Sequence, residues 1–495
     1  MPCTTILVGK NASYDGSTLI ARNEDSGAGA FTPKRFVYVK PEDQPRTYRS
    51  VLSKVTIDLP DDPLGYTAIP DADPKDGLWA AHGVNTANVA VSATETITSN
   101  ARVLGADPLV AYRPAEGQEG EPGYRPEVIG GIGEEDIVTI VLPYIRSARE
   151  GVARLGALLE EFGTYEKNGI AFQDVDEIWW LETIGGHHWM ARRVPDDVYV
   201  TMPNQLGIDA FDFDDAYGAQ EAFMCSADLR DFVTEHHLAL DLDGWFNPRL
   251  AFGSHTDSDH VYNTPRAWVM QRALNPRTFV WDGPDADYTP VSDDIPWCQV
   301  PERKITVEDV KELLSNHYQQ TPFDPYAHRE KTPFRPIGIS RNCHLAVIQM
   351  RPDVPDALRT IEWVTFGSNV YNTIVPFFTC IDETPKYFSF TPKKPSTESF
   401  YWANRLLGAL ADPYFNSTAN LFASYRLNVV ARAYAILHGV DNKHANASAE
   451  EIRSECMGAN QQIADMVQQE TDTLLGKILD IASDKMRNAF SLSDE

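Results

Sequence analysis

The sequence predicts a mixed α+β fold in which sheets are covered by helices, and three observations support this class. Strand-like stretches come first, helical stretches are interspersed among them, and the last part of the chain is strongly helical. Hydrophobic residues make up 43% and charged residues 23% of the 495 positions, as in an ordinary globular protein. We expect a core region over residues 1–398 and a helical region over residues 399–495 that packs on it.

The first elements follow from turn signals and alternating hydrophobic residues. We expect a β-hairpin at the start of the chain, with strands at 4–8 and 17–22 joined by a polar turn. Small and β-branched residues alternate over 79–96, which indicates two buried strands around a turn at 85–88. Residues 113–135 are rich in Pro, Gly and Glu and are predicted to form a long surface excursion.

The later elements follow from the same periodicities. Apolar residues recur at helical spacing over 137–159, and spacing near two residues returns between 178 and 204. Loops rich in Pro and Asp surround 281–301, and further strand-like runs stand at 346–350 and 360–365. This order of strands and helices is the basis of the α+β prediction.

The charge balance and the cysteine spacing narrow the possible partners and compartment. The chain has 71 acidic and 43 basic residues, which gives a formal net charge of −28. A field of this sign repels phosphate backbones and acidic lipid, so we expect no nucleic-acid or membrane partner. No stretch approaches the ~20 apolar residues of a membrane span, and the N-terminus lacks the features of a signal peptide. Six distant cysteines without a C-x-x-C pair indicate reduced thiols, so we expect a cytoplasmic protein.

Searches for common nucleotide, metal and serine-hydrolase motifs find none. The chain has no phosphate-binding P-loop, no H-E-x-x-H and no G-x-S-x-G. The glycine cluster at 130–133 precedes three carboxylates at 134–136, which would repel a pyrophosphate. The histidine pairs at 187–188 and 236–237 offer at most one ligand per face, because adjacent side chains point apart. We therefore expect no metal and no cofactor.

Cys3 offers a different chemistry because it lies at the start of the chain. If Met1 and Pro2 are removed, the α-amine of Cys3 stands beside its own thiol. The pKa of an α-amine is about 7.7–8.0, so this amine can act as a general base near neutral pH. Nucleophile and base then come from one residue. A cysteine is by default a small buried hydrophobic residue, and this alternative stays open at this point.

The predicted hairpin can place charged groups beside that thiol. A six-residue loop at 10–15 would put Cys3 opposite Arg22, whose guanidinium would favour the thiolate. A tighter turn at 15–16 would shift this register. Asp25 lies three residues after Arg22 and could orient the α-amine. By spacing alone, Arg22 and Asp25 can equally be the polar end of a strand.

Ordered motifs along most of the chain resemble a known family. They are CTTILVGK (3–10), YDGST (14–18), ARNEDS (21–26), KPEDQP (40–45), SATET (92–96), GADPLV (105–110), WLET (180–183), PNQL (203–206) and the stretch 363–376. Together they resemble the bacterial cysteine dipeptidases of the dipeptidase A type. These enzymes are N-terminal-nucleophile hydrolases, related to penicillin V acylase and bile salt hydrolase.

The resemblance implies an αββα sandwich with Cys3 on a central strand. It also implies a dipeptidase of broad specificity that acts through a thioester on Cys3. By motif, Arg22 and Asp25 match the family's Arg and Asp near the nucleophile. Asn204 matches an asparagine that helps to hold the oxyanion in the acylase relatives, and its amide suits that role. Arg266 is the implied counterpart of a later active-site arginine.

Glu95 departs from the pattern of the wider acylases. It stands where they carry a second oxyanion asparagine, so a backbone N–H would have to serve instead. Glu95 could also face a substrate α-ammonium, or pair with a surface lysine at a strand end. The partners that we expect are small peptide substrates and further copies of the chain in a homo-oligomer.

Two other functions remain as alternatives. One is an N-acyl amide hydrolase of the bile salt or penicillin V acylase kind, which the dipeptidase-like stretches outside the shared core disfavour. The other is a non-catalytic binding protein similar to the secernins. Retention of Cys3, Arg22, Asp25 and Asn204 together argues against it.

Overall fold

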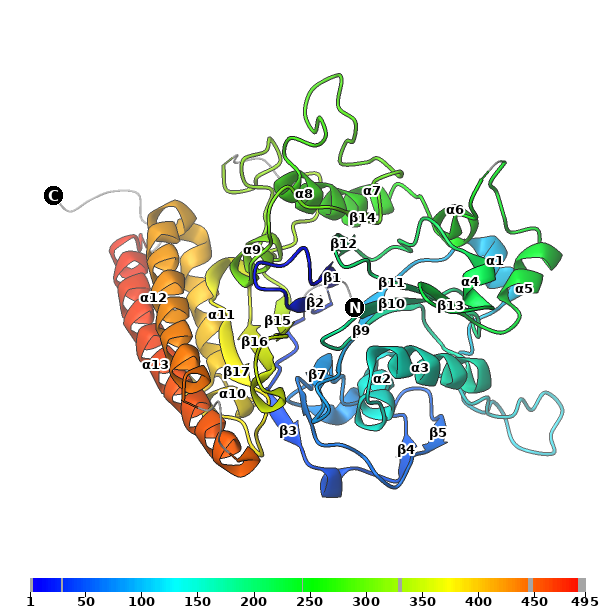
Figure 1. Cartoon of the computed structure of the whole chain (residues 1–495), viewed down its shortest axis with the longest axis horizontal. Coiled ribbons are helices and arrows are strands. Elements are labelled where there is room, and N and C mark those ends of the chain that lie inside the picture. Colours follow the sequence, from blue (N-terminus) through cyan, green and yellow to red (C-terminus); the bar gives the residue numbers. More distant parts are fainter. Residues whose placement is uncertain (1–2, 28–29, 243, 328–331, 444–447, 488–495) are drawn as a thin grey trace.

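Two antiparallel sheets form the centre of the fold, and helices cover their outer faces (Figure 1). The computed structural model describes residues 3–27, 30–242, 244–327, 332–443 and 448–487. Within this part of the chain, helices are combined with antiparallel sheets, which confirms the α+β prediction.

The first sheet places the start of the chain at its interior. Its seven strands follow the spatial order β14-β12-β1-β2-β15-β16-β17. Strand β1 therefore lies between β12 and β2, and all of its residues are buried. The strands are β1 (Cys3–Val8), β2 (Thr18–Asp25), β12 (Tyr199–Met202), β14 (Cys298–Gln299), β15 (Asn342–Met350), β16 (Thr360–Phe366) and β17 (Val375–Phe378).

The second sheet packs against one face of the first sheet, at β1 and β2. Leu7 and Ile20 of the first sheet share one hydrophobic cluster with Ala90 and Ala171 of the second. Its six strands are, in spatial order, β13 (Phe223–Cys225), β11 (Trp189–Arg193), β10 (Ile178–Thr183), β9 (Asn168–Gln173), β8 (Ala90–Thr96) and β7 (His82–Val84). Two small sheets pair β3 (Val37–Val39) with β6 (Tyr66–Ala68), and β4 (Thr47–Arg49) with β5 (Thr56–Asp58).

Helices complete the outer layers. Helices α2 and α3 pack on the second sheet, and α11, α12 and α13 pack beside β16 and β17 of the first sheet (Figure 1). The helices are α1 (Ala101–Ala106), α2 (Glu134–Val141), α3 (Ala148–Phe162), α4 (Phe213–Ala216), α5 (Leu229–Glu235), α6 (Pro248–Phe252), α7 (Asp259–Tyr262), α8 (Thr264–Leu274), α9 (Val307–Leu313), α10 (Lys386–Ser389), α11 (Phe400–Ala411), α12 (Phe415–Asp441) and α13 (Ala449–Asp484). The three C-terminal helices share one hydrophobic core with the first sheet.

Most element predictions are confirmed. Strands occur at the predicted hairpin, on both sides of the turn at 85–88, between 178 and 204, and at 346–350 and 360–365. The helical stretch over 137–159 forms α2 and α3, and the end of the chain is helical. The surface excursion is shorter than predicted, because residues 130–135 are buried and α2 already begins at Glu134.

The predicted register of the first hairpin is wrong. Cys3 lies opposite Glu24, and Arg22 lies opposite Thr5. The loop is longer than six residues because Gly9 and Asn11 leave the hairpin. Their backbone N–H groups donate to the carbonyl oxygens of Val198 and Asp196, respectively. The register of these two strands is therefore set by a contact with a distant part of the chain.

Candidate active site

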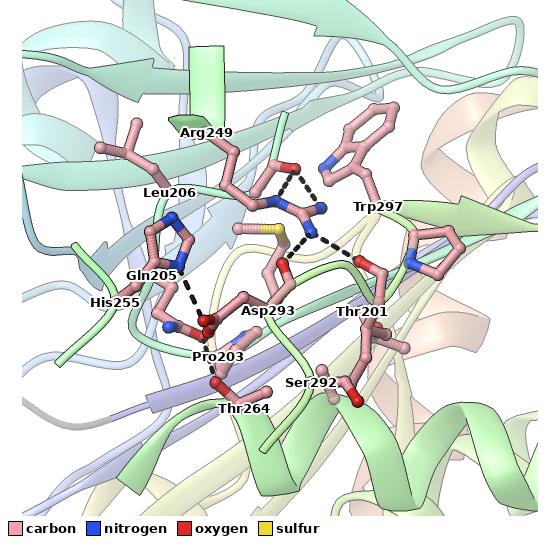
Figure 2. A pocket seen from close by; sticks show the side chains of 15 residues that line it. Thr201, Pro203, Gln205, Leu206, Arg249, His255, Thr264, Ser292, Asp293 and Trp297 are labelled. Carbon is pink, nitrogen blue, oxygen red and sulfur yellow. Dashed lines mark hydrogen bonds and ion pairs between the residues drawn. The ribbon is translucent and has the colours of Figure 1, made fainter. Parts of the chain in front are cut away.

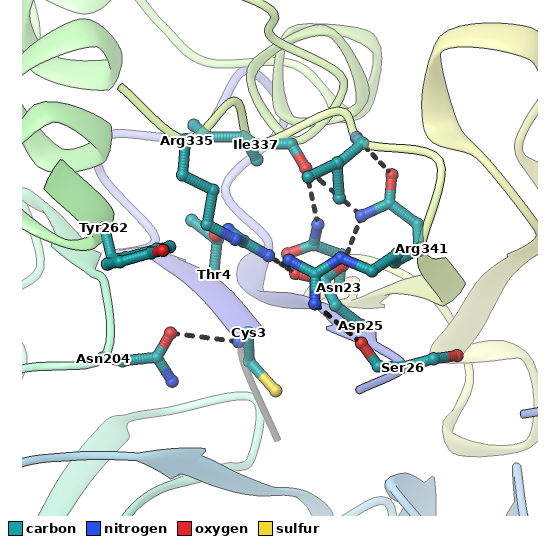
Figure 3. A network of polar contacts seen from close by, with 12 residues as sticks. Cys3, Thr4, Asn23, Asp25, Ser26, Asn204, Tyr262, Arg335, Ile337 and Arg341 are labelled. Atoms are coloured by element: carbon teal, nitrogen blue, oxygen red, sulfur yellow. Dashed lines mark hydrogen bonds and ion pairs between the residues drawn. The ribbon is translucent and has the colours of Figure 1, made fainter. Parts of the chain in front are cut away.

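Cys3 is the first residue of β1 and is held between the two neighbouring strands. Its exposed fraction is 0%, and Glu24 lies opposite it on β2. On the other side Thr5 pairs with Met202 of β12, so the antiparallel register places Asn204 opposite Cys3. The backbone nitrogen of Cys3 donates a hydrogen bond to Asn204 Oδ1 at 3.2 Å (Figure 3). The structure thus brings together two residues that are 201 positions apart.

The thiol of Cys3 faces the guanidinium of Arg22. Arg22 Nη2 lies 2.9 Å from Cys3 Sγ, although the two residues are not direct partners across the hairpin. They are diagonal neighbours on one face, which a long side chain can span. A buried cation at this distance favours the thiolate over the thiol. The contact expected from the sequence therefore forms, in a register different from the predicted one.

Arg22 is itself held by buried carboxylates. Its Nη2 also donates to Glu134 Oε1 at 2.7 Å, and Glu24 Oε2 lies 3.7 Å away. Burial lowers the pKa of Arg22, but the charges of Cys3, Glu134 and Glu24 outweigh it and raise the pKa above its ordinary value. Glu24 forms a second ion pair with Lys34 at 2.9 Å. The guanidinium beside the thiol therefore stays protonated, and the neighbouring carboxylates compensate part of its positive charge.

Arg266 fixes the main chain of Cys3. It is fully buried on α8, and Nη1 donates to the carbonyl oxygen of Cys3 and to Thr4 Oγ1 at 2.6 Å. Its other donors bind Asn204 Oδ1 at 2.6 Å, Asn263 Oδ1 at 2.9 Å and the Tyr262 carbonyl oxygen at 2.6 Å. All five N–H donors of the guanidinium are thus used within the protein.

Asp25 lies near the nucleophile, but its side chain and that of Arg22 point to opposite faces of β2. Its carboxylate accepts hydrogen bonds from Arg335 Nη2 and Asn342 Nδ2 (Figure 3). Its expected role as partner of the Cys3 α-amine stays a prediction. Met1, Pro2 and the side chain of Glu95 lie outside the described residues, although Glu95 itself is part of β8.

Three contacts of the site were missed in the sequence. Glu134 follows the glycine cluster at 130–133, where its charge argues against a phosphate site but does not indicate a contact with Arg22. This carboxylate at the N-terminus of α2 can be identified as a site residue only once the strand register is known, because the register decides what faces the start of β1. Arg335 and Asn342 lie in or just after a loop without any motif, and no signal in the sequence identifies them.

The histidine pair at 187–188 is bound to a carboxylate. His188 Nδ1 lies 2.8 Å and His187 Nδ1 3.4 Å from the oxygens of Asp107. Burial raises the pKa of Asp107, but hydrogen bonds from the His188 ring and from both backbone N–H groups lower it to about 2. In the described part of the chain, no group of three or more His, Cys, Asp or Glu residues could hold a metal ion. Among the same residues, no helix is long and apolar enough to cross a membrane.

A pocket adjoins the site on the side of Asn204 and Arg266. Gln205, which follows Asn204, and Thr264, two positions before Arg266, line it together with Leu206 and Trp297 (Figure 2). The guanidinium of Arg249 forms one wall, and its donors bind the backbone carbonyl oxygens of Gly207, Asp293 and Ile295. Arg249 therefore shapes the pocket, because its hydrogen bonds hold the loop at 293–295 against one side of it.

The sequence comparisons identify the family. The model of peptidase family C69 matches residues 2–428, which is most of the chain. The chain belongs to peptidase family C69. The "Dipeptidase" of Bifidobacterium longum is 55% identical to it over 100% of both chains. The "Probable dipeptidase A" of Streptococcus pyogenes serotype M1 is 55% identical over 99% of this chain and 98% of the relative. The "Dipeptidase A" of Lactobacillus helveticus is 44% identical over 99% of both chains.

Membership of this family makes the chain a peptidase. It confirms the resemblance to the dipeptidase A type that the ordered motifs indicated.

Proposed function

We propose that the chain is a cysteine dipeptidase in which Cys3 is the nucleophile. The observation that carries this proposal is the buried thiol of Cys3 at 2.9 Å from Arg22 Nη2, at the start of a central strand. The relatives named as dipeptidases match the chain over nearly its whole length, which supports the same activity here.

The mechanism follows from the groups around Cys3. Once Met1 and Pro2 are removed, the α-amine of Cys3 takes the thiol proton, and the thiolate attacks the carbonyl of the scissile bond. Asn204 Nδ2 donates one N–H to the Thr96 carbonyl oxygen at 2.7 Å, and its second N–H is available to stabilise the oxyanion together with a backbone N–H. The protonated amine then donates to the leaving amino acid. Water hydrolyses the thioester by the reverse sequence.

The arrangement of layers supports a finer fold assignment. We propose the αββα sandwich of the N-terminal-nucleophile hydrolases, since two facing sheets lie between outer helices and Cys3 stands on an inner strand. We also propose that the helical region from residue 399 forms a unit that packs on the core over 1–398.

A hydrolysis panel tests the activity. We expect turnover of free dipeptides and little or none of N-blocked dipeptides or glycocholate. Turnover of the blocked substrates without the free dipeptides would instead make the chain an acylase. Activity is expected to survive exhaustive chelation and to be lost with iodoacetamide, because the mechanism uses a thiolate and an amine. Loss with EDTA that zinc restores would contradict the mechanism.

A further inference from the structure

Two buried arginines beside Cys3 differ in how many of their donors are used. Arg266 has a protein acceptor for each of its five N–H groups. Arg335 binds Asp25 through Nη2, while its Nε and Nη1 have no hydrogen-bond partner among the residues that the structure describes. Only 6% of Arg335 is exposed, so water does not solvate these donors freely. A buried cationic donor without an acceptor is costly, which indicates that a ligand supplies one.

Arg335 lies at the end of the strand pair that carries the nucleophile. Asp25, its partner, directly follows Glu24, the residue opposite Cys3. Figure 3 shows the guanidinium directed toward Asp25 and the start of β1. The backbone of Arg335 is fixed on both sides, since its N–H donates to the Val261 carbonyl oxygen at 3.0 Å and its carbonyl oxygen accepts from Tyr318 Oη at 2.9 Å. The spare donors are thus held in place beside Asp25, at the end of β2.

We propose that Arg335 binds the α-carboxylate of the dipeptide substrate. This inference rests on the proposed dipeptidase function. A dipeptide carries its carboxylate one residue beyond the scissile bond and spans only about 7 Å, a length on the scale of neighbouring positions across β1 and β2. Charge-assisted hydrogen bonds from a guanidinium to a carboxylate are the strong kind. Arg266 has no donor left for it, and Arg22 Nη2 is already bound to Cys3 and Glu134.

This contact gives a physical reason for a preference for dipeptides. A longer peptide replaces the carboxylate at this position with a neutral amide, and an amidated dipeptide does the same without adding length. Either change leaves the donors of Arg335 without their anionic acceptor. Arg335 would therefore select substrates whose chain ends one residue after the scissile bond.

The test compares a free dipeptide with its C-terminal amide in the wild type, in Arg335→Gln and in the control Arg341→Gln. Arg341 lies on the same segment, loses the same charge and binds the Ser26 carbonyl oxygen at 3.1 Å. The wild type and the control are expected to prefer the free dipeptide in kcat/KM by about 10- to 100-fold. Arg335→Gln should lose this preference, because kcat/KM falls about 10- to 100-fold more for the free dipeptide, with a higher KM, than for the amide.

The outcomes separate the inference from the proposed function. If Arg335→Gln lowers kcat/KM equally for both substrates, Arg335 only supports Asp25 and the inference is wrong. If the wild type hydrolyses neither substrate, the proposed function fails instead. A second measurement needs no variant: a non-hydrolysable dipeptide isostere should inhibit the wild type more strongly than its amide. Equal inhibition by the two compounds would overturn the inference.

Discussion

The thiol and the main chain of Cys3 lie in different surroundings. The thiol side, made of Arg22, Glu24 and Glu134, is a set of buried charges around the sulfur atom. The main-chain side, made of Arg266 and Asn204, holds the backbone oxygen and nitrogen through hydrogen bonds. The thiol side therefore controls how readily the sulfur ionises, whereas the main-chain side controls where the nucleophile stands.

The largest effect is expected for Cys3→Ala, which removes the nucleophilic thiol that both sides support. We expect kcat/KM to fall by at least about 10³-fold, since the nucleophile is lost. Intact-mass analysis of the active wild type should show loss of Met1 and Pro2, and the variant should retain Pro2. We expect removal of Pro2 to begin with attack of the Cys3 thiol on the carbonyl carbon of Pro2, and the variant has no thiol for this step.

The matched control is Cys456→Ala, at a buried cysteine on α13 far from the site in the fold. It should keep both activity and inactivation by iodoacetamide. Full activity of a protein that still begins at Met1 or Pro2 would mean that the α-amine is not the base.

On the thiol side, Arg22→Gln removes the cation next to the sulfur. We expect kcat/KM to fall by about 10²-fold. The rate of alkylation of Cys3 by iodoacetamide should rise only at higher pH than in the wild type, because the thiolate loses its counter-charge. An alkylation profile with an unchanged midpoint would show that Arg22 does not act on the charge of the sulfur.

On the main-chain side, Arg266→Lys should leave that midpoint where it is. A lysine cannot reproduce the five donors of the buried guanidinium, so the free energy of unfolding is expected to fall by about 1–3 kcal/mol. We expect kcat to fall by about tenfold, because the carbonyl of Cys3 is no longer fixed. Urea unfolding and the alkylation profile measure the two effects. A shifted midpoint would remove the distinction between the two sides.

Glu134→Gln should act on the thiol side with the opposite sign to Arg22→Gln. The substitution removes a negative charge 2.7 Å from Arg22 and leaves a neutral group of the same shape. Fewer carboxylates then compensate the positive charge of Arg22, so the guanidinium favours the thiolate more strongly. The alkylation midpoint should therefore move to lower pH, whereas movement to higher pH would mean that Glu134 acts mainly by positioning Arg22.

The smallest effect concerns stability near Glu134. Burial and the charge of Glu134 raise the pKa of Glu166 from 4.5 to about 7. Between these two values the folded protein binds a proton that the unfolded chain releases, so this group makes stability fall as pH rises. Glu166→Gln keeps an acceptor for the Glu134 N–H and removes the titration. In thermal unfolding, the difference in stability between the variant and the wild type should move in favour of the variant from pH 5 to pH 8. An equal difference at both pH values would contradict this.

The sequence predicts local features well and long-range contacts poorly. The strands of the first hairpin follow from alternation and turn residues, but their register depends on backbone bonds from Gly9 and Asn11 to a distant segment. The importance of Cys3 follows from its chemistry, and Asn204 was identified only by the resemblance, which did not predict its place opposite Cys3. Glu134 and Arg335 reach the site from a helix terminus and a loop, whose positions no local pattern encodes.

The hydrogen bond to Asn204 Oδ1 does not depend on the chemical state of the Cys3 nitrogen. An amide in the precursor, an amine in the resting enzyme and an ammonium during acylation each carry at least one N–H, and a carbonyl oxygen accepts from all three. An N–H directed at Asn204 also leaves the lone pair of the amine free to turn toward the sulfur. One fixed acceptor can therefore serve maturation and every step of turnover, and the site needs no rearrangement between them.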